Sequence, residues 1–267
     1  MVSSVRYDVN LSILFTELDV LQRPAAAKAA GFYAVEYWWP FSVPVPSDQE
    51  VEAFVRAVED AGVRLVGLNF FAGALPAGER GVLSDPARAS EFADNLDVAV
   101  GIGDRLGCRA FNALYGNRVH GLEPSEQDDV ATESLIRAAQ ATARIGGRVL
   151  IEPVSGVPDY PLKKAADALR VIDRVHEEGG VDNLRLLFDI YHLTVNGDDP
   201  DAVIERHAQQ IGHVQIADAP GRNEPGTGDI DFDRCFGKLD AAGYTGYVGL
   251  EYKPSGASAD GFDWLER

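Results

Sequence analysis

The chain has 267 residues, of which 46% are hydrophobic and 25% are charged, and its formal net charge at pH 7 is −18. A chain of this length and composition can bury one large core, so we expect a single domain over residues 1–267. The strong negative charge argues against binding to nucleic acid or to an anionic membrane surface.

Two cysteines, Cys108 and Cys235, lie in apolar helical contexts, and neither has the spacing of a redox or zinc motif. The chain begins without a long apolar stretch behind a basic region, and no segment approaches the roughly 20 apolar residues of a membrane span. We therefore expect reduced thiols and a cytoplasmic protein.

Strand-like and helix-like patterns alternate along the whole chain, which favours a parallel sheet wrapped by helices over an antiparallel sandwich. Eight strands in such an order predict a (β/α)8 TIM barrel, an α/β fold of about 250 residues. The expected strands are Asp8–Ile13, Ala34–Tyr37, Arg64–Asn69, Ala110–Leu114, Val149–Glu152, Leu184–Asp189, Gly212–Ala217 and Tyr247–Leu250. The expected helices are Arg23–Ala30, Asp48–Ala61, Asp85–Leu106, Ser125–Ile145, Leu162–Glu178, Pro200–Gln209 and Phe232–Ala242.

The last strand–helix unit is short. Few residues follow the eighth strand, so we expect a stunted eighth helix, or one whose place is covered by a neighbouring subunit. This feature is the basis for expecting a homodimer or homotetramer. The longest loops follow the second, third and seventh strands, and in a TIM barrel such loops line the active-site mouth.

Four oxygen-bearing side chains each close one of the last four expected strands. They are Glu152, Asp189, Gln215 and Glu251. Because the carboxyl ends of parallel barrel strands face one mouth, these side chains are expected to converge. Carboxylate and amide oxygens without thiolate suit Mg²⁺ or Mn²⁺, whereas a zinc site more often uses His or Cys. The set therefore predicts a cage for a divalent metal ion.

Glu152 and Glu251 lie on the fifth and eighth expected strands, so they can approach a substrate from opposite sides. One glutamate can take a proton from a carbon beside a carbonyl and the other can return it. This arrangement predicts aldose–ketose isomerisation or epimerisation through an enediolate. The simpler interpretation is that strand-end polar residues cap helices or pair with Lys or Arg, and four oxygen-bearing side chains on successive strands argue against it.

Several longer stretches carry a family resemblance over nearly the whole chain. The sequence resembles the hydroxypyruvate isomerase family within the xylose isomerase-like barrels, which also include the ketose 3-epimerases. The matching stretches are NLSILF at Asn10–Phe15, AAGFYAVEYWWPF at Ala29–Phe41, PAGERGVLSDP at Pro76–Pro86, FDIYH at Phe188–His192, GHVQIADAPGRNEPGTGDIDF at Gly212–Phe232 and GYVGLEYKP at Gly246–Pro254.

This resemblance implies that hydroxypyruvate is converted to tartronate semialdehyde. It makes Glu152, Asp189, Gln215 and Glu251 the metal ligands, with the two glutamates also acting as the acid/base pair. It further places His192 and Arg222 against substrate oxygens. Gln215 stands where the related sugar epimerases carry a His ligand, which indicates the hydroxypyruvate branch. The alternatives are a ketose 3-epimerase, an isomerase of a neutral sugar or of a larger keto acid such as 2-oxo-tetronate, and a non-catalytic binding barrel.

One segment departs from the family pattern. After Pro153 the hydroxypyruvate branch commonly continues with Asn-Thr-Arg-Asp, whereas this chain reads VSGVPDYP over Val154–Pro161. The expected arginine is absent. Either another cation holds the substrate carboxylate, or the substrate is not a keto acid. The candidate cations are Arg80, Arg222, Lys163 and Lys253.

Further polar residues have both a structural and a functional interpretation. His192 can donate to a substrate oxygen or be a satisfied structural histidine. Lys253 can enter the site or pair with a carboxylate at the barrel rim, and Glu36 is expected to make a hydrogen bond inside the barrel. Asn10, Asn69 and Asn112 either cross-link the barrel or touch the ligand.

Aromatic residues and a glycine-rich segment complete the candidates. Trp38, Trp39 and Phe41 form either an apolar wall at the mouth or a subunit contact. The PGTGD segment at Pro225–Asp229 lacks the Lys and glycine spacing of nucleotide motifs, so we expect it to shape a turn.

A phosphodiester hydrolase is the competing enzyme class, because some metal-dependent nucleases share this superfold. Such an enzyme needs a His-rich zinc site and a basic surface. The chain has five histidines and a net charge of −18. The sequence therefore favours a small-molecule substrate over a nucleic acid.

Overall fold

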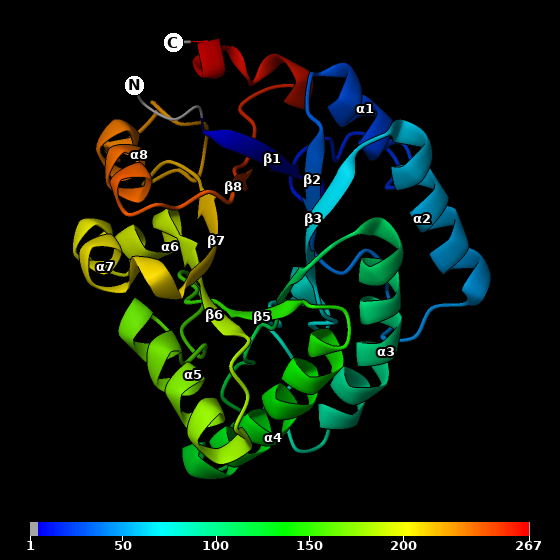
Figure 1. The fold of residues 1–267 in the computed structure, drawn as a ribbon, viewed down its shortest axis with the longest axis vertical. Helices are drawn as coiled ribbons and strands as arrows, with labels where there is room; N and C mark the ends of the chain where they lie inside the picture. The colour runs from blue at the N-terminus through cyan, green and yellow to red at the C-terminus, as the bar shows by residue number, and fades with distance from the viewer. Residues whose placement is uncertain (1–4, 267) are drawn as a thin grey trace.

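Eight parallel strands close into a barrel in sequence order, and β8 pairs with β1. The computed structural model describes residues 5–266. Figure 1 shows the strands around the centre and the helices outside them. The TIM barrel expected from the alternation is therefore confirmed. The strands are β1 Arg6–Asn10, β2 Ala34–Tyr37, β3 Arg64–Asn69, β4 Ala110–Asn112, β5 Arg148–Ile151, β6 Leu184–Asp189, β7 Ile211–Ile216 and β8 Tyr247–Leu250.

In the part of the chain that the structure describes, eight α-helices connect these strands, with short 3₁₀ turns between some of the elements. The α-helices are α1 Arg23–Ala29, α2 Asp48–Ala61, α3 Ala89–Leu106, α4 Pro124–Ala143, α5 Ala165–Gly179, α6 Ile190–Val195, α7 Pro200–His207 and α8 Phe232–Ala241. The 3₁₀ turns are η1 Leu75–Ala77, η2 Ala208–Gln210, η3 Ser258–Asp260 and η4 Asp263–Glu266. Within the described residues no helix is both long and apolar enough to cross a bilayer.

Local sequence explains where α2 begins and ends. Ser47 accepts a hydrogen bond from the Glu50 backbone N–H, and the Glu50 side chain accepts from the Ser47 backbone N–H, which forms a capping box. Gly62 ends the helix at φ +65°, a left-handed conformation that costs little without a Cβ. The strands are buried on both faces, as β2 and β8 show, because helices cover the outside and side chains fill the inside.

Three expected boundaries were wrong by three residues or more. Helix α3 begins at Ala89 rather than Asp85, because Asp85 forms a turn in which its side chain accepts from the Ala87 backbone N–H. Helix α5 begins at Ala165 rather than Leu162, because the Asp167 carboxylate accepts from the backbone N–H of Lys164 at the helix start. Strand β1 ends at Asn10, before the expected Ile13.

Helix α6 was missed by the sequence interpretation. It has six residues and follows β6 directly, so it is too short to show helical periodicity. Asp189 is both the last residue of β6 and the N-cap of α6.

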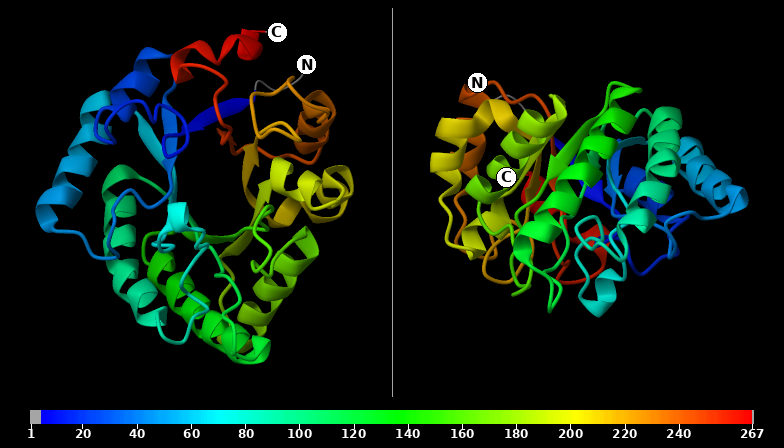
Figure 2. Two further views of the ribbon diagram at one scale, coloured as in Figure 1. Left: turned by 180° about the vertical axis from the view of Figure 1, so that it is seen from behind. Right: turned by 90° about the horizontal axis from the view of Figure 1, so that it is seen from below.

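The C-terminal segment fills the position of a full eighth barrel helix with two 3₁₀ turns, as expected for a stunted unit. Phe262 packs against Phe32 with ring centroids 4.7 Å apart, and Trp264 packs against Tyr7 at 5.5 Å. Figure 2 shows this red segment beside α1. The segment closes the barrel wall next to β1 and β8.

Both cysteines are free and buried. Burial raises the pKa of Cys108 to about 12 and that of Cys235 to about 11. Thiolates are therefore scarce at neutral pH, which agrees with two unreactive core thiols.

Candidate active site

A cavity of about 670 Å³ opens at the carboxyl ends of the barrel strands. Five of the expected site residues line it, and they come from the segments that follow β3, β5, β6, β7 and β8. They are Arg80, Glu152, His192, Arg222 and Glu251. Trp38, Trp39 and Phe41 form part of its wall, and the rings of Trp39 and Phe41 pack edge to face at 5.1 Å.

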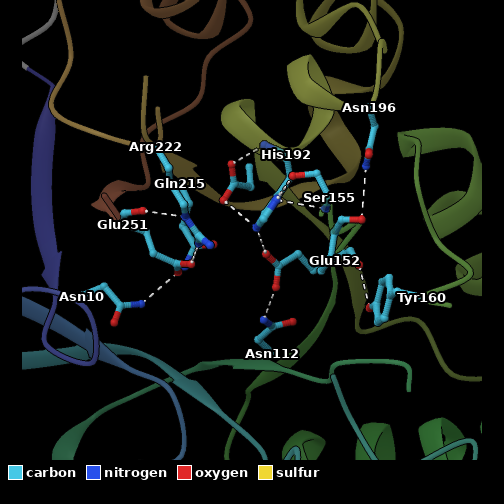
Figure 3. A network of polar contacts seen from close by, with 12 residues as sticks. Asn10, Asn112, Glu152, Ser155, Tyr160, His192, Asn196, Gln215, Arg222 and Glu251 are labelled. Atoms are coloured by element: carbon cyan, nitrogen blue, oxygen red, sulfur yellow. Dashed lines mark hydrogen bonds and ion pairs between the residues drawn. The ribbon is translucent and has the colours of Figure 1, made fainter. Parts of the chain in front are cut away.

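Each of the two glutamates is held by an asparagine from the neighbouring strand. Asn112, at the end of β4, donates to Glu152 Oε2 at 2.6 Å. Asn10, at the end of β1, donates to Glu251 Oε2 at 2.9 Å. Figure 3 shows the two glutamates entering the site from different sides. Asn10 and Asn112 therefore orient the expected acid/base pair, in addition to linking strands.

Glu251 has two further donors. Arg222 Nη2 lies 2.5 Å from Glu251 Oε1, and Trp38 Nε1 lies 3.3 Å from Oε2. The Arg222 backbone has φ +59°, which is uncommon for a residue with a Cβ, and its guanidinium lies over the Tyr191 ring at 5.4 Å. The loop after β7 thus directs this arginine toward the cavity.

Among residues 5–266, Asp189 and Gln215 each leave one buried oxygen without a hydrogen-bond partner. Asp189 Oδ1 accepts from the His192 backbone N–H at 2.9 Å, while Oδ2 has no partner. Gln215 Nε2 donates to Glu36 Oε1 at 2.7 Å, while Gln215 Oε1 has no partner. Buried acceptors normally find a donor or a cation, so these two atoms indicate a binding position.

The carboxylates also disfavour one another's ionisation. Burial raises the pKa of Glu152 well above its usual range, and Glu251 and Asp189 raise it further. Burial raises the pKa of Glu251 to about 8 although Arg222 lowers it, and burial raises that of Asp189 to about 6. Glu152 and Asp189 lie in one group with His192, in which the possible ligand atoms are all within 4.8 Å of one another, and their carboxylate oxygens suit a hard divalent cation.

His192 is a neutral imidazole with its proton on Nε2. The Ser155 backbone N–H donates to His192 Nδ1 at 3.0 Å, so that nitrogen must carry a lone pair. Burial lowers the pKa of His192 well below its usual value, and Arg222 and Arg80 lower it further. Nε2 lies 3.8 Å from both Glu152 Oε1 and Asp189 Oδ2. The ring therefore presents a hydrogen-bond donor to the cavity.

The structure separates the candidate cations. Arg80 lines the cavity, and its Nη1 donates to the Leu75 and Glu79 carbonyls at 3.0 and 2.6 Å. Lys253 is exposed and lies outside the cavity lining. Lys163 donates to the Val157 carbonyl. Of the four candidate cations, the fold brings Arg80 and Arg222 to this cavity, which Arg23 also lines.

The glycine-rich segment folds around a carboxylate of the protein itself. Asp218 accepts from the backbone N–H groups of Gly226 and Gly228 at 2.8 and 2.9 Å. A Cβ on Gly228 would lie 2.0 Å from the Ala219 carbonyl oxygen, so only glycine fits there. The expectation that PGTGD shapes a turn is confirmed.

Sequence reasoning missed the function of Ser155 and undervalued Asn10 and Asn112. The asparagines had a readable signal, because each ends a strand of the barrel and each glutamate comes directly after one. Ser155 had none, because it contacts a residue 37 positions away through its backbone.

A sequence model of the family described as xylose isomerase-like TIM barrel matches residues 24–267. A Streptomyces coelicolor protein provisionally named a hydroxypyruvate isomerase is 53% identical over 97% of this chain and 95% of its own length. The hydroxypyruvate isomerase of Escherichia coli is 33% identical over 98% of each chain.

Two further relatives bear on the substrate class. The 2-oxo-tetronate isomerase of Cupriavidus necator is 34% identical over 98% of this chain and 97% of its own length. A solved structure from Brucella melitensis, named an AP endonuclease of family 2, superposes with a TM-score of 0.88 at 31% identity and covers 98% of each chain.

Proposed function

The chain belongs to the hydroxypyruvate isomerase family of the xylose isomerase-like TIM barrels, and we propose that it is a metal-dependent isomerase of a small hydroxy-keto acid. The reaction moves a carbonyl between adjacent carbons, with hydroxypyruvate and tartronate semialdehyde as the substrate pair. The observation that carries the proposal is the pair of cavity glutamates, each oriented by an asparagine amide and entering from a different side.

Glu152, Asp189, Gln215 and Glu251 are the residues proposed to hold the cation, Mg²⁺ or Mn²⁺. The support is the oxygen-only donor set, the unpartnered Asp189 Oδ2 and Gln215 Oε1, and the raised carboxyl pKa values. When bound, such a cation polarises adjacent carbonyl and hydroxyl oxygens and stabilises an enediolate.

The proton transfers are proposed to use the two glutamates. One carboxylate removes the proton from the hydroxyl-bearing carbon, which gives the enediolate, and the other carboxyl group returns a proton to the former carbonyl carbon. The hydroxyl proton passes from the oxygen of the first carbon to that of the second. His192 Nε2–H is a suitable donor to one of these oxygens, because its Nδ1 is occupied by the Ser155 N–H.

Arg80 and Arg222 are proposed to bind the substrate carboxylate. They line the same cavity. Each uses only some of its five N–H groups in hydrogen bonds to the described residues, so the others can donate to a substrate. They replace the arginine that this chain lacks after Pro153. A four-carbon acid such as 2-oxo-tetronate fits the same scheme, and the relative of that name supports it as an alternative.

A ketose 3-epimerase acting on neutral sugars uses the same two carboxylates but has no carboxylate to bind. The presence of Arg80 and Arg222 in one cavity favours the acid. Phosphodiester hydrolysis is disfavoured despite the name of the Brucella melitensis relative, because a net charge of −18 opposes binding of a nucleic-acid backbone.

Proton NMR of hydroxypyruvate in D₂O tests the proposal. The purified protein is incubated with Mg²⁺ or Mn²⁺, beside an EDTA-treated control. We expect tartronate semialdehyde to form and deuterium to enter beside the carbonyl only when the metal is present. If neither occurs, hydroxypyruvate is not the substrate, and 2-oxo-tetronate and neutral ketoses are compared in the same assay.

A further inference from the structure

Glu36, on β2, is a buried residue whose hydrogen bonds join β2 to two other strands, β1 and β7. Its Oε1 accepts from Asn10 Nδ2 at 3.1 Å and from Gln215 Nε2 at 2.7 Å. Its Oε2 lies 2.7 Å from His213 Nε2, two residues before Gln215 on β7. The side chain is only 3% exposed, so these contacts exclude solvent.

Glycines on β3 and β8 leave room for this carboxylate. A Cβ on Gly67 of β3 would lie 3.0 Å from Glu36 Oε2, and a Cβ on Gly249 of β8 would lie 2.7 Å from Oε1. Larger residues at either position would push the carboxylate aside. The barrel interior is therefore shaped around Glu36, and the side chain has little freedom to reorient.

This fixed acceptor determines which way the Gln215 amide faces. A carboxylate can accept a hydrogen bond but cannot donate one, so it selects the Nε2 end of the amide. The Oε1 end must then face away from Glu36, where it is buried without a partner. Asn10 extends the effect, because the same Nδ2 group donates to both Glu36 Oε1 and Glu251 Oε2.

We propose that Glu36 is a positioning residue for the divalent cation: it aims Gln215 Oε1 at the cation and, through Asn10, orients Glu251. The inference rests on the proposed function, since it needs the cation that the four oxygen ligands would hold. Partners that orient ligands in this way typically change metal affinity by 10–100-fold when they are removed.

The test measures Mn²⁺ affinity by calorimetry or by the electron paramagnetic resonance of free Mn²⁺, without substrate. Glu36→Met removes the acceptor at similar volume, and we expect about 10–100-fold weaker binding. Glu36→Gln keeps an acceptor oxygen but removes the charge, and we expect binding within about threefold of the wild type. If Glu36→Gln loses as much affinity as Glu36→Met, the charge matters rather than the positioning, and the inference fails.

A double-mutant cycle tests whether Glu36 acts through Gln215. Gln215→Ala removes the ligand that Glu36 is proposed to orient. Adding Glu36→Met should then lower Mn²⁺ affinity only by the smaller amount that comes from the Asn10 link to Glu251. If the loss of Mn²⁺ affinity in the double variant equals the product of the two single losses, the two residues act independently and the inference is overturned.

A milder variant covers the case in which Glu36→Met does not fold. In Gly67→Ala the atoms nearest the new methyl group all belong to Glu36. We expect a smaller loss of Mn²⁺ affinity than for Glu36→Met, and unchanged affinity would overturn the inference. If the wild-type protein binds no Mn²⁺ or Mg²⁺, the proposed function fails as well, whereas normal binding by folded Glu36→Met overturns only the positioning role.

Discussion

The two glutamates at the barrel mouth have different hydrogen-bond partners on its two sides. On the β8 side, Glu251 accepts from Asn10 and Trp38 and pairs with Arg222. On the β5 side, Glu152 accepts from Asn112, and its Oε1 faces the neutral His192 at 3.8 Å. Two carboxyl groups in different environments can hold different protonation states at one pH. The asymmetry indicates how one site can both remove and return a proton.

The largest expected effect comes from removing either glutamate. Glu152→Gln and Glu251→Gln each keep the size of the side chain but remove the proton acceptor, so we expect a loss in kcat of roughly 10²–10⁴-fold. The measurement is turnover at saturating metal, with thermal unfolding as the control for folding. Near-wild-type turnover by either variant would show that the two-glutamate scheme is wrong.

Arg80→Ala gives a cleaner test of carboxylate binding because, within the described residues, Arg80 forms no hydrogen bond or ion pair with either glutamate and donates to backbone carbonyls. A charge-assisted hydrogen bond to a substrate carboxylate is worth about 1.5–3 kcal/mol, so we expect KM for the acid to rise about 10–100-fold. Arg222→Ala would be less selective, because Arg222 also pairs with Glu251.

Lys253→Ala is the matched control for this loss of a cation. Its side chain is exposed and outside the cavity lining, so KM should stay within about twofold of the wild type. Equal effects of Arg80→Ala and Lys253→Ala would refute a carboxylate-binding role specific to Arg80.

The two asparagines test the asymmetry directly. Asn112→Ala removes the side-chain donor to Glu152, whereas after Asn10→Ala the Glu251 carboxylate still has Arg222 and Trp38. We expect kcat to fall about tenfold for Asn112→Ala, which corresponds to about 1.4 kcal/mol, and less for Asn10→Ala. A larger loss of kcat for Asn10→Ala than for Asn112→Ala would show that Glu251, and not Glu152, depends more on its asparagine.

The metal-free protein should become less stable as the pH rises from 6.5 to 8. Burial raises the pKa of Glu251 to about 8, so in this range the folded state holds a proton that the unfolded chain has released. Burial lowers the pKa of His213, but Glu36 raises it, to about 9. Folded His213 therefore also keeps a proton that the unfolded chain releases, and it too makes the protein less stable as the pH rises. His192 does not offset them, because its lowered pKa affects stability only below its ordinary value of 6.5.

The expected decrease in the free energy of unfolding is about 1–2 kcal/mol for Glu251 alone. Denaturant unfolding of the EDTA-treated protein at several pH values measures it. Saturating Mn²⁺ should remove the part of the decrease that comes from Glu251, because the cation takes the place of its proton, and should leave the part that comes from His213. A metal-free protein that becomes more stable over this range would contradict the cause given for it.

The smallest expected effect is that of Ser155→Ala. The variant keeps the backbone N–H that donates to His192 Nδ1, so the Nε2–H form should persist and kcat should change by less than about threefold. Nitrogen-15 NMR of the His192 ring checks the tautomer. A shift of the proton to Nδ1 would show that the hydroxyl, and not the backbone, controls the ring.

The sequence alone predicted the barrel and the residues at the ends of its last four strands. Both follow from local patterns, because alternating strand and helix periodicities dictate the fold class and strand-end residues of a parallel barrel must face one mouth. The expected role of Glu36 in a hydrogen bond inside the barrel was also confirmed, since β2 places it there.

Closure of the barrel decided what those residues contact. Asn10 reaches Glu251 across 241 positions of the chain because β1 pairs with β8. Loop paths decided that Arg80 lines the cavity while Lys253 is exposed, and a loop amide 37 positions away set the proton of His192. These contacts depend on long-range packing and on single hydrogen bonds, which leave no periodic pattern in the sequence.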